Sequence, residues 1–257
     1  MAISNHSPLS TMLPKLETWT TFDSDDRAAL VALPHRVRSL GPSQYIVREG
    51  DRAENCCLLL SGFGFRSKIV GDGGRQIVAI HMKGDMVDLQ NSVLGVADHN
   101  VQALTAIEIA LIPREAILEL VAERPRVAQA MWHDTLVDGS IHREWTANVG
   151  RRDSATRMAH LLCEFALRLE HAGLGEHCDY ELPMTQEHLA DCLGLTPVHV
   201  NRTLKALEAE GLITRTMRAV RVANWDKLAA AGDFNSTYLH VDLEGRSTDR
   251  TRPLARA

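Results

Sequence analysis

The sequence predicts an α+β protein built from an N-terminal β domain, a long helix and a C-terminal helix-turn-helix. Between residues 41 and 112, short apolar runs alternate with glycine turns, a pattern typical of a small antiparallel sandwich or barrel. After Pro125, apolar residues recur every three or four positions, which predicts a helix. Between residues 182 and 207, two short helical patterns are separated by a glycine, as in a helix-turn-helix.

Residues 1–40 are expected to form a leader followed by short helices. Asp23 or Ser24 precedes a short helical stretch and can cap it, because either side chain can accept a hydrogen bond from a free N–H group of the first turn. The β domain then begins near residue 41. Its expected strands are Tyr45–Val47, Cys57–Leu60, Phe63–Val70, Gln76–His81 and Val101–Ile112.

The chain becomes helical at Pro113, a residue suited to the first position of a helix. The longer helix after Pro125 carries an apolar stripe close to the seam of a two-stranded coiled coil, interrupted by Asp134 and Asp138. We expect the stripe to pair with a second copy of the chain, because a long helix between two domains has little else to cover it. Packing against its own β domain is the alternative. The residues expected at the dimer interface are Val127, Met131, Val137, Ile141 and Trp145.

A hinge is expected at residues 150–153, before an amphipathic helix at residues 156–169. The polar tail after Leu243 is expected to be disordered. The expected domains are residues 1–124 for the β domain with its flanking helices, 125–150 for the long helix and hinge, 151–230 for the helix-turn-helix domain, and 231–257 for a C-terminal extension.

The helix-turn-helix stretch carries a complete set of local start and stop residues. Thr185 can cap a first helix, and Gly194 permits the left-handed backbone of a sharp turn. Thr196 can cap a second helix, with Pro197 at its first position. The buried face of the second helix is expected at Val200, Leu204 and Leu207. Polar side chains are then left on the exposed face, as a DNA-reading helix requires.

The distribution of charge supports this interpretation better than the total does. The formal net charge of -5 does not by itself indicate a nucleic-acid partner. Residues 196–205 and 214–222, however, contain basic side chains and no acid. The second of these stretches has the pattern of a β hairpin, which predicts a wing close to the phosphate backbone.

At these residues the chain resembles the Crp/Fnr family of bacterial transcription regulators, over nearly all of residues 35–228. The resemblance includes the glycines of the β domain, at Gly50, Gly62, Gly73 and Gly84. It implies a cyclic-nucleotide-binding-like β-roll, a long dimerisation helix and a winged helix-turn-helix. It further implies a homodimer that reads a roughly palindromic site on double-stranded DNA and acts on RNA polymerase.

The resemblance assigns base reading to Arg202, and an arginine can bond guanine O6 and N7 together. Val198 lies where the family often has a glutamate that reads cytosine. Valine can instead pack on a thymine methyl group, so we expect a different recognised sequence. The candidate DNA contacts are Thr185, Gln186, Thr196, Val198, His199, Asn201, Arg202 and Lys205 on the two helices, and Arg215, Arg218 and Arg221 on the wing.

The candidate effector pocket, again from the resemblance, is Gly84, Asp85, Met86, Val87, Asp88 and Leu89. Cyclic-nucleotide binders of this fold carry an arginine that neutralises the phosphate, but residues 99–103, where it is expected, contain none. Asp85 and Asp88 would repel an unneutralised phosphate, which argues against cyclic AMP. No cysteine precedes Cys56, which argues against the iron–sulfur cluster of the family's oxygen sensors. No cofactor is predicted; haem on His81 or His99, or another small effector, stays open.

Other classes of protein find little support in the sequence. The five cysteines lack paired metal-ligand spacing and are expected to be free thiols. We find no nucleophile–base motif and no glycine-rich phosphate loop, so no enzyme is expected. No apolar run approaches the ~18 residues of a membrane span, and residues 1–14 lack the features of an export signal, so the expected location is cytoplasmic. The alternative function is a regulatory ligand-binding or protein-interaction module without DNA readout.

Overall fold

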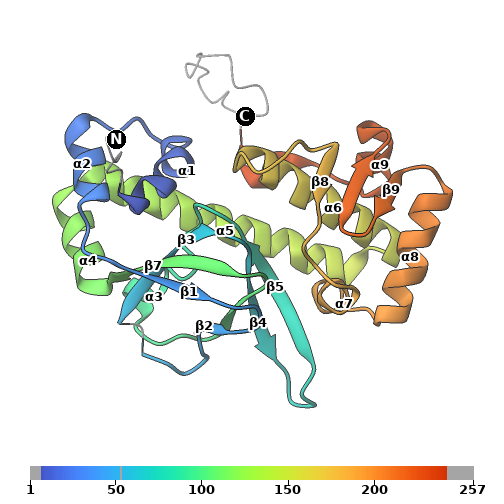
Figure 1. The fold of residues 1–257 in the computed structure, drawn as a ribbon, viewed down its shortest axis with the longest axis horizontal. Coiled ribbons are helices and arrows are strands. Elements are labelled where there is room, and N and C mark those ends of the chain that lie inside the picture. The colour runs from blue at the N-terminus through green and yellow to red at the C-terminus, as the bar shows by residue number, and fades with distance from the viewer. Residues whose placement is uncertain (1–6, 53, 242–257) are drawn as a thin grey trace, which may run out of the picture.

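The computed structural model describes residues 7–52 and 54–241. The long helix α5 (Pro125–Arg151) runs the length of the molecule, from the β-roll at one end to a helical C-terminal domain at the other (Figure 1). The tail predicted to be disordered, after Leu243, lies outside the described residues. Among the described residues, no helix combines the length and the hydropathy needed to cross a bilayer.

The N-terminal domain is a β-roll of two antiparallel sheets. One sheet has the order β1-β7-β3 and the other the order β2-β6-β4-β5. The strands are β1 (Arg36–Leu40), β2 (Tyr45–Val47), β3 (Asn55–Ser61), β4 (Gly64–Ile69), β5 (Arg75–His81), β6 (Asn100–Ala103) and β7 (Ile107–Pro113). The predicted β domain is therefore present, and each predicted run lies within or overlaps an observed strand.

Two details of the β-roll differ from the prediction. The sequence placed residues 36–40 in the leader, but they form β1, an edge strand with four exposed residues and no alternating apolar pattern. The predicted run Val101–Ile112 is two strands, because the chain bends at residues 104–106. Gly62 packs against this bend at a φ of +77°, and a Cβ atom there would lie 2.3 Å from the carbonyl oxygen of Ala106.

Short helices cover one side of the β-roll. They are the 3-10 helix η1 (Pro8–Met12), α1 (Leu13–Glu17), α2 (Ser24–Val31), α3 (Asn91–Leu94) and α4 (Arg114–Glu123). Asp23 caps α2 by accepting hydrogen bonds from the N–H groups of Asp25 at 3.0 Å and Asp26 at 2.9 Å, as predicted. Leu9, Met12 and Leu16 share a core with β3, β7 and the start of α5.

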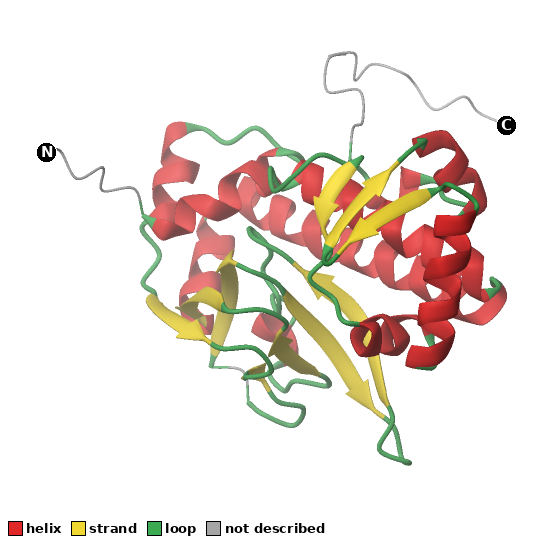
Figure 2. Cartoon of the chain, turned by 45° about the vertical axis from the view of Figure 1, so that its right-hand side comes forward, coloured by secondary structure: helices red, strands yellow, loops and turns green. Residues whose placement is uncertain are grey.

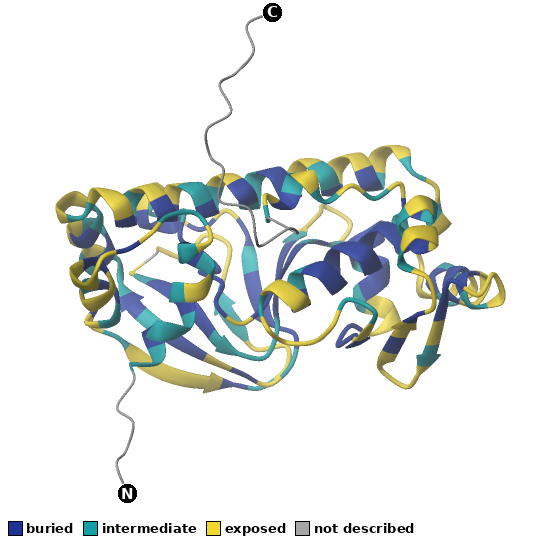
Figure 3. Ribbon diagram, turned by 90° about the horizontal axis from the view of Figure 1, so that it is seen from above, coloured by how far each residue is buried: buried dark blue, intermediate teal, exposed yellow. Residues whose placement is uncertain are grey.

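The apolar stripe of α5 is covered by the chain itself. Val127 and Met131 pack in the core of the N-terminal helices, and Val137, Ile141 and Trp145 pack in a core shared with the C-terminal domain. The alternative considered for the sequence, packing against the β domain, describes only part of this arrangement, because the C-terminal domain also covers the stripe. The opposite face of α5 is exposed (Figure 3), and its large apolar side chains are Trp132, 68% exposed, and Leu136, 55% exposed.

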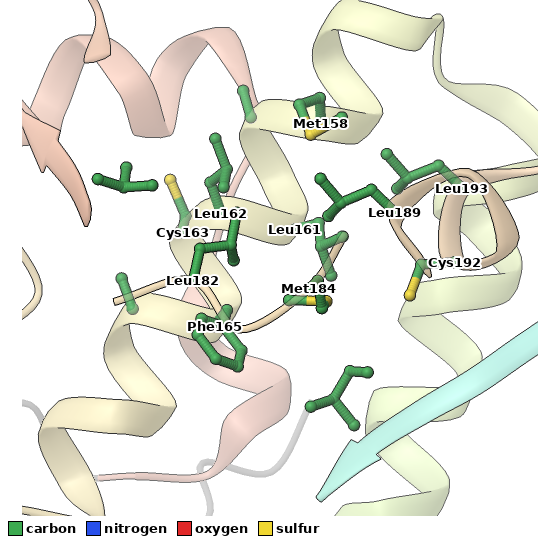
Figure 4. Close-up of a cluster of buried hydrophobic side chains, with 14 of the residues drawn as sticks. Met158, Leu161, Leu162, Cys163, Phe165, Leu182, Met184, Leu189, Cys192 and Leu193 are labelled. Atoms are coloured by element: carbon green, nitrogen blue, oxygen red, sulfur yellow. The ribbon is translucent and has the colours of Figure 1, made fainter. Parts of the chain in front are cut away.

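The C-terminal domain packs its helices around α6 (Ser154–His171). Its remaining elements are β8 (Asp179–Glu181), α7 (Gln186–Leu193), α8 (Pro197–Ala209), β9 (Ile213–Thr216), β10 (Ala219–Val222), α9 (Trp225–Ala231) and the 3-10 helix η2 (Ser236–Leu239). Leu189 and Leu193 of α7 lie beside Met158 and Leu161 of α6 in the core (Figure 4). The small sheet has the order β8-β10-β9, so the predicted hairpin gains β8 as a third strand.

The two ends of the molecule are packed together. The long β4–β5 hairpin reaches from the β-roll to α7 (Figure 2). Phe65, Ile77 and Ile80 of these strands belong to the same core as Met158 and Leu162 of α6. The expected hinge is shorter than predicted, because α5 continues through Gly150 to Arg151 and α6 begins at Ser154.

Candidate nucleic-acid interface

The turn between α7 and α8 is built by local capping. Thr185 Oγ1 accepts a hydrogen bond from the N–H of His188 at 3.2 Å, and the His188 ring returns a contact to the N–H of Thr185. Gly194 ends α7 at a φ of +63°, in the left-handed region that favours glycine. Thr196 Oγ1 accepts from the N–H of His199 at 3.3 Å, and Pro197 begins α8. These features are the predicted ones.

The exposed face of this unit carries most of the candidate DNA contacts. Val200, Leu204 and Leu207 are buried, as predicted, and so anchor α8 to the domain. Arg202 and Lys205 then lie exposed along α8, and Val198 is 82% exposed near its beginning. Thr185, Gln186 and Thr196 are also exposed. The helix-turn-helix therefore presents one polar surface from both helices.

Two candidate residues are partly engaged within the chain. The His199 ring nitrogen Nε2 lies 3.0 Å from Ser154 Oγ at the start of α6, so this half-buried ring ties α8 to α6. Asn201 Nδ2 donates to Gln186 Oε1 at 3.4 Å, which brings a residue of α8 beside one of α7. Asn201 therefore lies next to a candidate contact of the other helix.

The three wing arginines are not equivalent. Arg215 bonds both carboxylate oxygens of Glu208 at 3.1 Å, and Arg221 bonds Asp179 at 2.8 Å. Arg218 lies at the turn of the wing with its side chain 61% exposed, and its ion-pair neighbour Glu181 is 4.0 Å away. The sequence showed the basic hairpin but not the acids from α8 and β8 that fold back onto it.

Strand β5 of the β-roll contacts α7 of the helix-turn-helix through residues that were not among the candidates from the sequence. The guanidinium of Arg75 on β5 bonds the carboxylate of Asp191 on α7 at 2.6 Å. Gln76 Nε2 donates to the carbonyl oxygen of Cys192 at 3.1 Å. These partners are 116 residues apart in the chain, so no local pattern indicates them.

The residues of the candidate effector pocket do not all face the same cavity. Gly84, Asp85, Met86 and Leu89 line a cavity between the β-roll loop, the N-terminal helices, α5 and α6. Val87 and Asp88 instead face the β-roll: the Val87 carbonyl accepts from Arg66 Nη2, and Asp88 Oδ1 accepts from the N–H of Cys57 at 2.7 Å.

An arginine that the sequence argument overlooked lies inside the β-roll. Arg66 on β4 is 5% exposed, and its Nη1 bonds Asp138 of α5 at 2.8 Å. Burial alone would raise the pKa of Asp138, but Arg66 reverses this and lowers it to about 2. Asp138 is therefore ionised at neutral pH, and it neutralises the guanidinium of Arg66.

The candidate metal and thiol residues form no metal site in the described part of the chain. No group of three or more His, Cys, Asp or Glu side chains is arranged there to hold a metal ion. His81 and His99 are both buried, and His99 bonds the neighbouring Asp98. The cysteines are free thiols, as predicted, and burial raises the pKa of Cys56 to about 12.

Fold and surface together define a class: a DNA-binding transcription regulator with a sensor-type β-roll. Comparison with known sequences supports each half. Residues 37–124 match the family described as the cyclic nucleotide-binding domain, and residues 156–231 match the Crp-like helix-turn-helix domain.

The chain is also similar to whole proteins over most of their length. The chain is 30% identical over 199 residues to the transcriptional activatory protein AadR of Rhodopseudomonas palustris, covering 74% of this chain and 80% of AadR. It is 29% identical over 224 residues to the transcriptional activator protein FnrL of Cereibacter sphaeroides, covering 85% of this chain and 89% of FnrL. The structure of FixK2 from Bradyrhizobium japonicum superposes with a TM-score of 0.70 at 24% identity, over 77% of this chain and 98% of FixK2.

The chain belongs to the Crp/Fnr family of transcription regulators. The predicted fold class, a β-roll followed by a long helix and a winged helix-turn-helix, is confirmed. The predicted function as a DNA-binding transcription regulator is confirmed at the level of the family, whose helix-turn-helix this chain carries.

Proposed function

We propose that the chain acts as a homodimer that binds a roughly palindromic site on double-stranded DNA and works with RNA polymerase in the cytoplasm. In this proposal it acts by binding and not by catalysis. The observation that carries it is the exposed face of α8, where Arg202 and Lys205 project from a helix whose other face is buried. In helix-turn-helix regulators the corresponding helix lies in the major groove.

Base reading is assigned to Arg202 and positioning to the residues around it. An exposed arginine on the early turns of such a helix can bond guanine O6 and N7 at once. Gln186 and Thr185 lie at the N-terminus of α7, where a side chain and free N–H groups suit a phosphate. Lys205 and Arg218 are exposed cations suited to further phosphates.

The proposed pairing face is the exposed side of α5 and not the stripe expected from the sequence. Val127, Met131, Val137, Ile141 and Trp145 are each at most 8% exposed in the single chain, so they are not available to a partner in this conformation. Trp132 and Leu136 are four residues apart and therefore share one side of the helix, which suits a coiled-coil contact.

The reading role is tested by selecting binding sites from random DNA and measuring affinity by mobility shift. We expect the wild type to enrich a palindrome with half-sites about one duplex turn apart. Arg202→Ala should lose roughly 10- to 100-fold in preference at one base pair of each half-site, from the ~1–3 kcal/mol of a bidentate contact. Arg36→Ala, an exposed arginine on β1, is the control. Failure of the wild type to enrich any site would contradict the proposal.

The pairing face is tested by sedimentation. We expect Trp132→Lys to shift the protein toward monomer, because a charge in the seam of a coiled coil is desolvated without a partner. Val37→Lys places the same charge on an exposed apolar residue of β1 and should leave the dimer unchanged. A monomeric wild type, or a Trp132→Lys dimer as tight as the wild type, would contradict the assignment.

A further inference from the structure

A cavity of about 420 Å³ lies where the two halves of the molecule meet. Its walls come from α1, the loop after β5, α5, the end of α6 and the segment around Leu239. The volume lies within the ~300–1,000 Å³ typical of small-molecule sites. Asp138, whose carboxylate is paired with Arg66 of the β-roll, also lines the cavity.

The charged groups of the cavity leave one carboxylate poorly compensated. Lys15 Nζ lies 2.7 Å from Asp85 Oδ1 and 2.8 Å from Asp134 Oδ1. Asp85 has a second cation, Arg168, at 3.5 Å. Asp134 shares Lys15 and has no other ion-pair partner among the described residues. Its second oxygen, Oδ2, is therefore the acceptor that a ligand can use.

His81 adds no positive charge that would repel a cation in the cavity. It lines the cavity, is 4% exposed, and its Nδ1 lies 3.7 Å from Asp85 Oδ2. Burial lowers the pKa of His81 to about 4, so the ring is neutral at pH 7.

The remaining walls are apolar. Met82, Met86 and Leu89 come from the β-roll loop, and Val137 and Ile141 come from α5. Trp19 closes another side and is held by stacking on His133 at 4.3 Å between ring centroids. Flexible methionines beside a fixed aromatic ring suit a flat apolar body.

We propose that this cavity binds a small organic amine with a flat apolar body. The amine donates to Asp134 Oδ2, and the body lies between the methionines of the loop and the apolar residues of α5. An organic anion is disfavoured, because Lys15 and Arg168 are already paired with acids, the third lining cation, Lys83, is exposed to solvent and therefore screened, and Asp85, Asp134 and Asp138 would all repel it.

The inference deepens the proposed function, because it names the class of signal that the sensor side receives. The cavity walls belong to both the β-roll side and α6 of the DNA-binding side. An occupant therefore contacts both, and its binding free energy depends on how the two halves are docked. If DNA binding favours one docked arrangement, the ligand and DNA change each other's binding free energy by the same amount.

The test uses the full chain and three probes that share one ring system: tryptamine, indole and indole-3-acetate. We expect titration calorimetry at pH 7 to show one tryptamine per chain, bound at least tenfold more tightly than indole-3-acetate, with indole between them. Asp134→Asn should weaken tryptamine about tenfold and leave indole unchanged. Asp98→Asn, an exposed acid of the β-roll outside the cavity, is the matched control.

A second variant separates loss of the site from loss of the fold. Met86→Trp fills the cavity without removing a charge, and it should abolish binding of tryptamine and indole while circular dichroism shows a folded chain. Equal affinity for the amine and the acid, no binding of any probe, or tryptamine binding that both variants leave intact would each overturn the inference. Site selection on DNA is measured separately, so a failed cavity with intact DNA binding refutes only this inference.

Discussion

The two halves of the molecule differ in whether their buried polar side chains have hydrogen-bond partners. In the part of the chain that is described, the buried side-chain atoms without a hydrogen-bond partner all lie between Trp19 and His133, in the β-roll and the helices packed on it. They include Arg66 Nε, Ser67 Oγ and both polar atoms of Asn91. In the C-terminal half the buried Glu164 and His160 are fully engaged.

In the C-terminal half, Glu164 and His160 form a hydrogen-bond network with residues of three segments. The carboxylate of Glu164 accepts from Trp145 Nε1 at 2.9 Å and from the hydroxyl of Tyr238 at 2.8 Å. His160 Nδ1 contacts the carbonyl oxygen of Gly232 at 3.0 Å. These bonds join α5, α6 and the C-terminal segment into a rigid base for the helix-turn-helix.

The difference follows from what each half has to do. An unpaired buried polar group costs about 1–3 kcal/mol, so it lowers the stability of the free protein. A sensor can keep such groups, because a ligand that satisfies them gains that free energy on binding. A DNA-reading surface gains from rigid support instead, since ordering it on binding would weaken affinity.

The largest effect on stability is expected from breaking the hydrogen-bond network around Glu164. Glu164→Leu leaves the N–H of Trp145 without an acceptor, removes the carboxylate that accepts from the hydroxyl of Tyr238, and removes a charge beside Arg168. We expect the free energy of unfolding in urea to fall by roughly 3–5 kcal/mol. Glu164→Gln keeps one acceptor oxygen and should lose less than half of that. An unchanged midpoint for Glu164→Leu would contradict the assigned role of the network.

The next effect concerns Asp88, which is 1% exposed inside the β-roll. Burial raises the pKa of this carboxyl from its ordinary 3.8 to about 6. The folded state therefore holds the proton more strongly than the unfolded state. The stability contributed by this group is complete below about pH 4 and falls as the pH rises to about 6, by roughly 3 kcal/mol in total.

Asp88→Asn tests this directly, because the amide oxygen still accepts from the N–H of Cys57. We expect the variant to lose the slope of unfolding free energy between pH 4 and pH 6, relative to the wild type. Asp98→Asn, whose side chain is 79% exposed, provides the reference for removing a β-roll charge. Parallel pH profiles for the wild type and Asp88→Asn would refute the cost assigned to burial.

A smaller effect compares the same residue type in the two halves. Both polar atoms of Asn91 are buried without a partner, whereas Asn224 caps α9 by accepting from the N–H of Lys227 at 3.0 Å. We expect Asn91→Leu to raise the free energy of unfolding by about 1–2 kcal/mol. Asn224→Ala should lower it by about 1 kcal/mol. If both variants lost stability, the proposed difference between the unpartnered Asn91 and the hydrogen-bonded Asn224 would be wrong.

The helix-turn-helix could be predicted from the sequence because its determinants are local. Thr185, Gly194 and Thr196 each act on backbone groups within a few residues, so their identities and spacing suffice. The strands between glycine turns were found for the same reason. The edge strand β1 was missed because its exposed residues carry no alternating pattern.

What the sequence could not supply are the contacts across long separations. The pairs Lys15–Asp85, Arg66–Asp138 and Arg75–Asp191 join residues 70, 72 and 116 positions apart. The apolar stripe of α5 illustrates the same limit. Helical periodicity showed which face of α5 is covered, but not whether the covering atoms belong to the same chain or to a second copy. In the sequence, Asp134 and Asp138 only interrupt the stripe; in the structure their carboxylates pair with Lys15 and Arg66.

The smallest effect on stability belongs to the exposed cations of the C-terminal half, whose role is toward DNA. Lys205→Ala removes a solvent-exposed charge, so the free energy of unfolding should change by less than about 0.5 kcal/mol. On DNA, the slope of log affinity against log salt should decrease by about 0.9, the value for one lost phosphate contact. Arg215→Ala is the matched comparison: its guanidinium is held by Glu208, so we expect less than half of that change in slope. If Lys205→Ala left the slope intact while Arg215→Ala reduced it, the wing, and not the exposed face of α8, would carry the phosphate contacts.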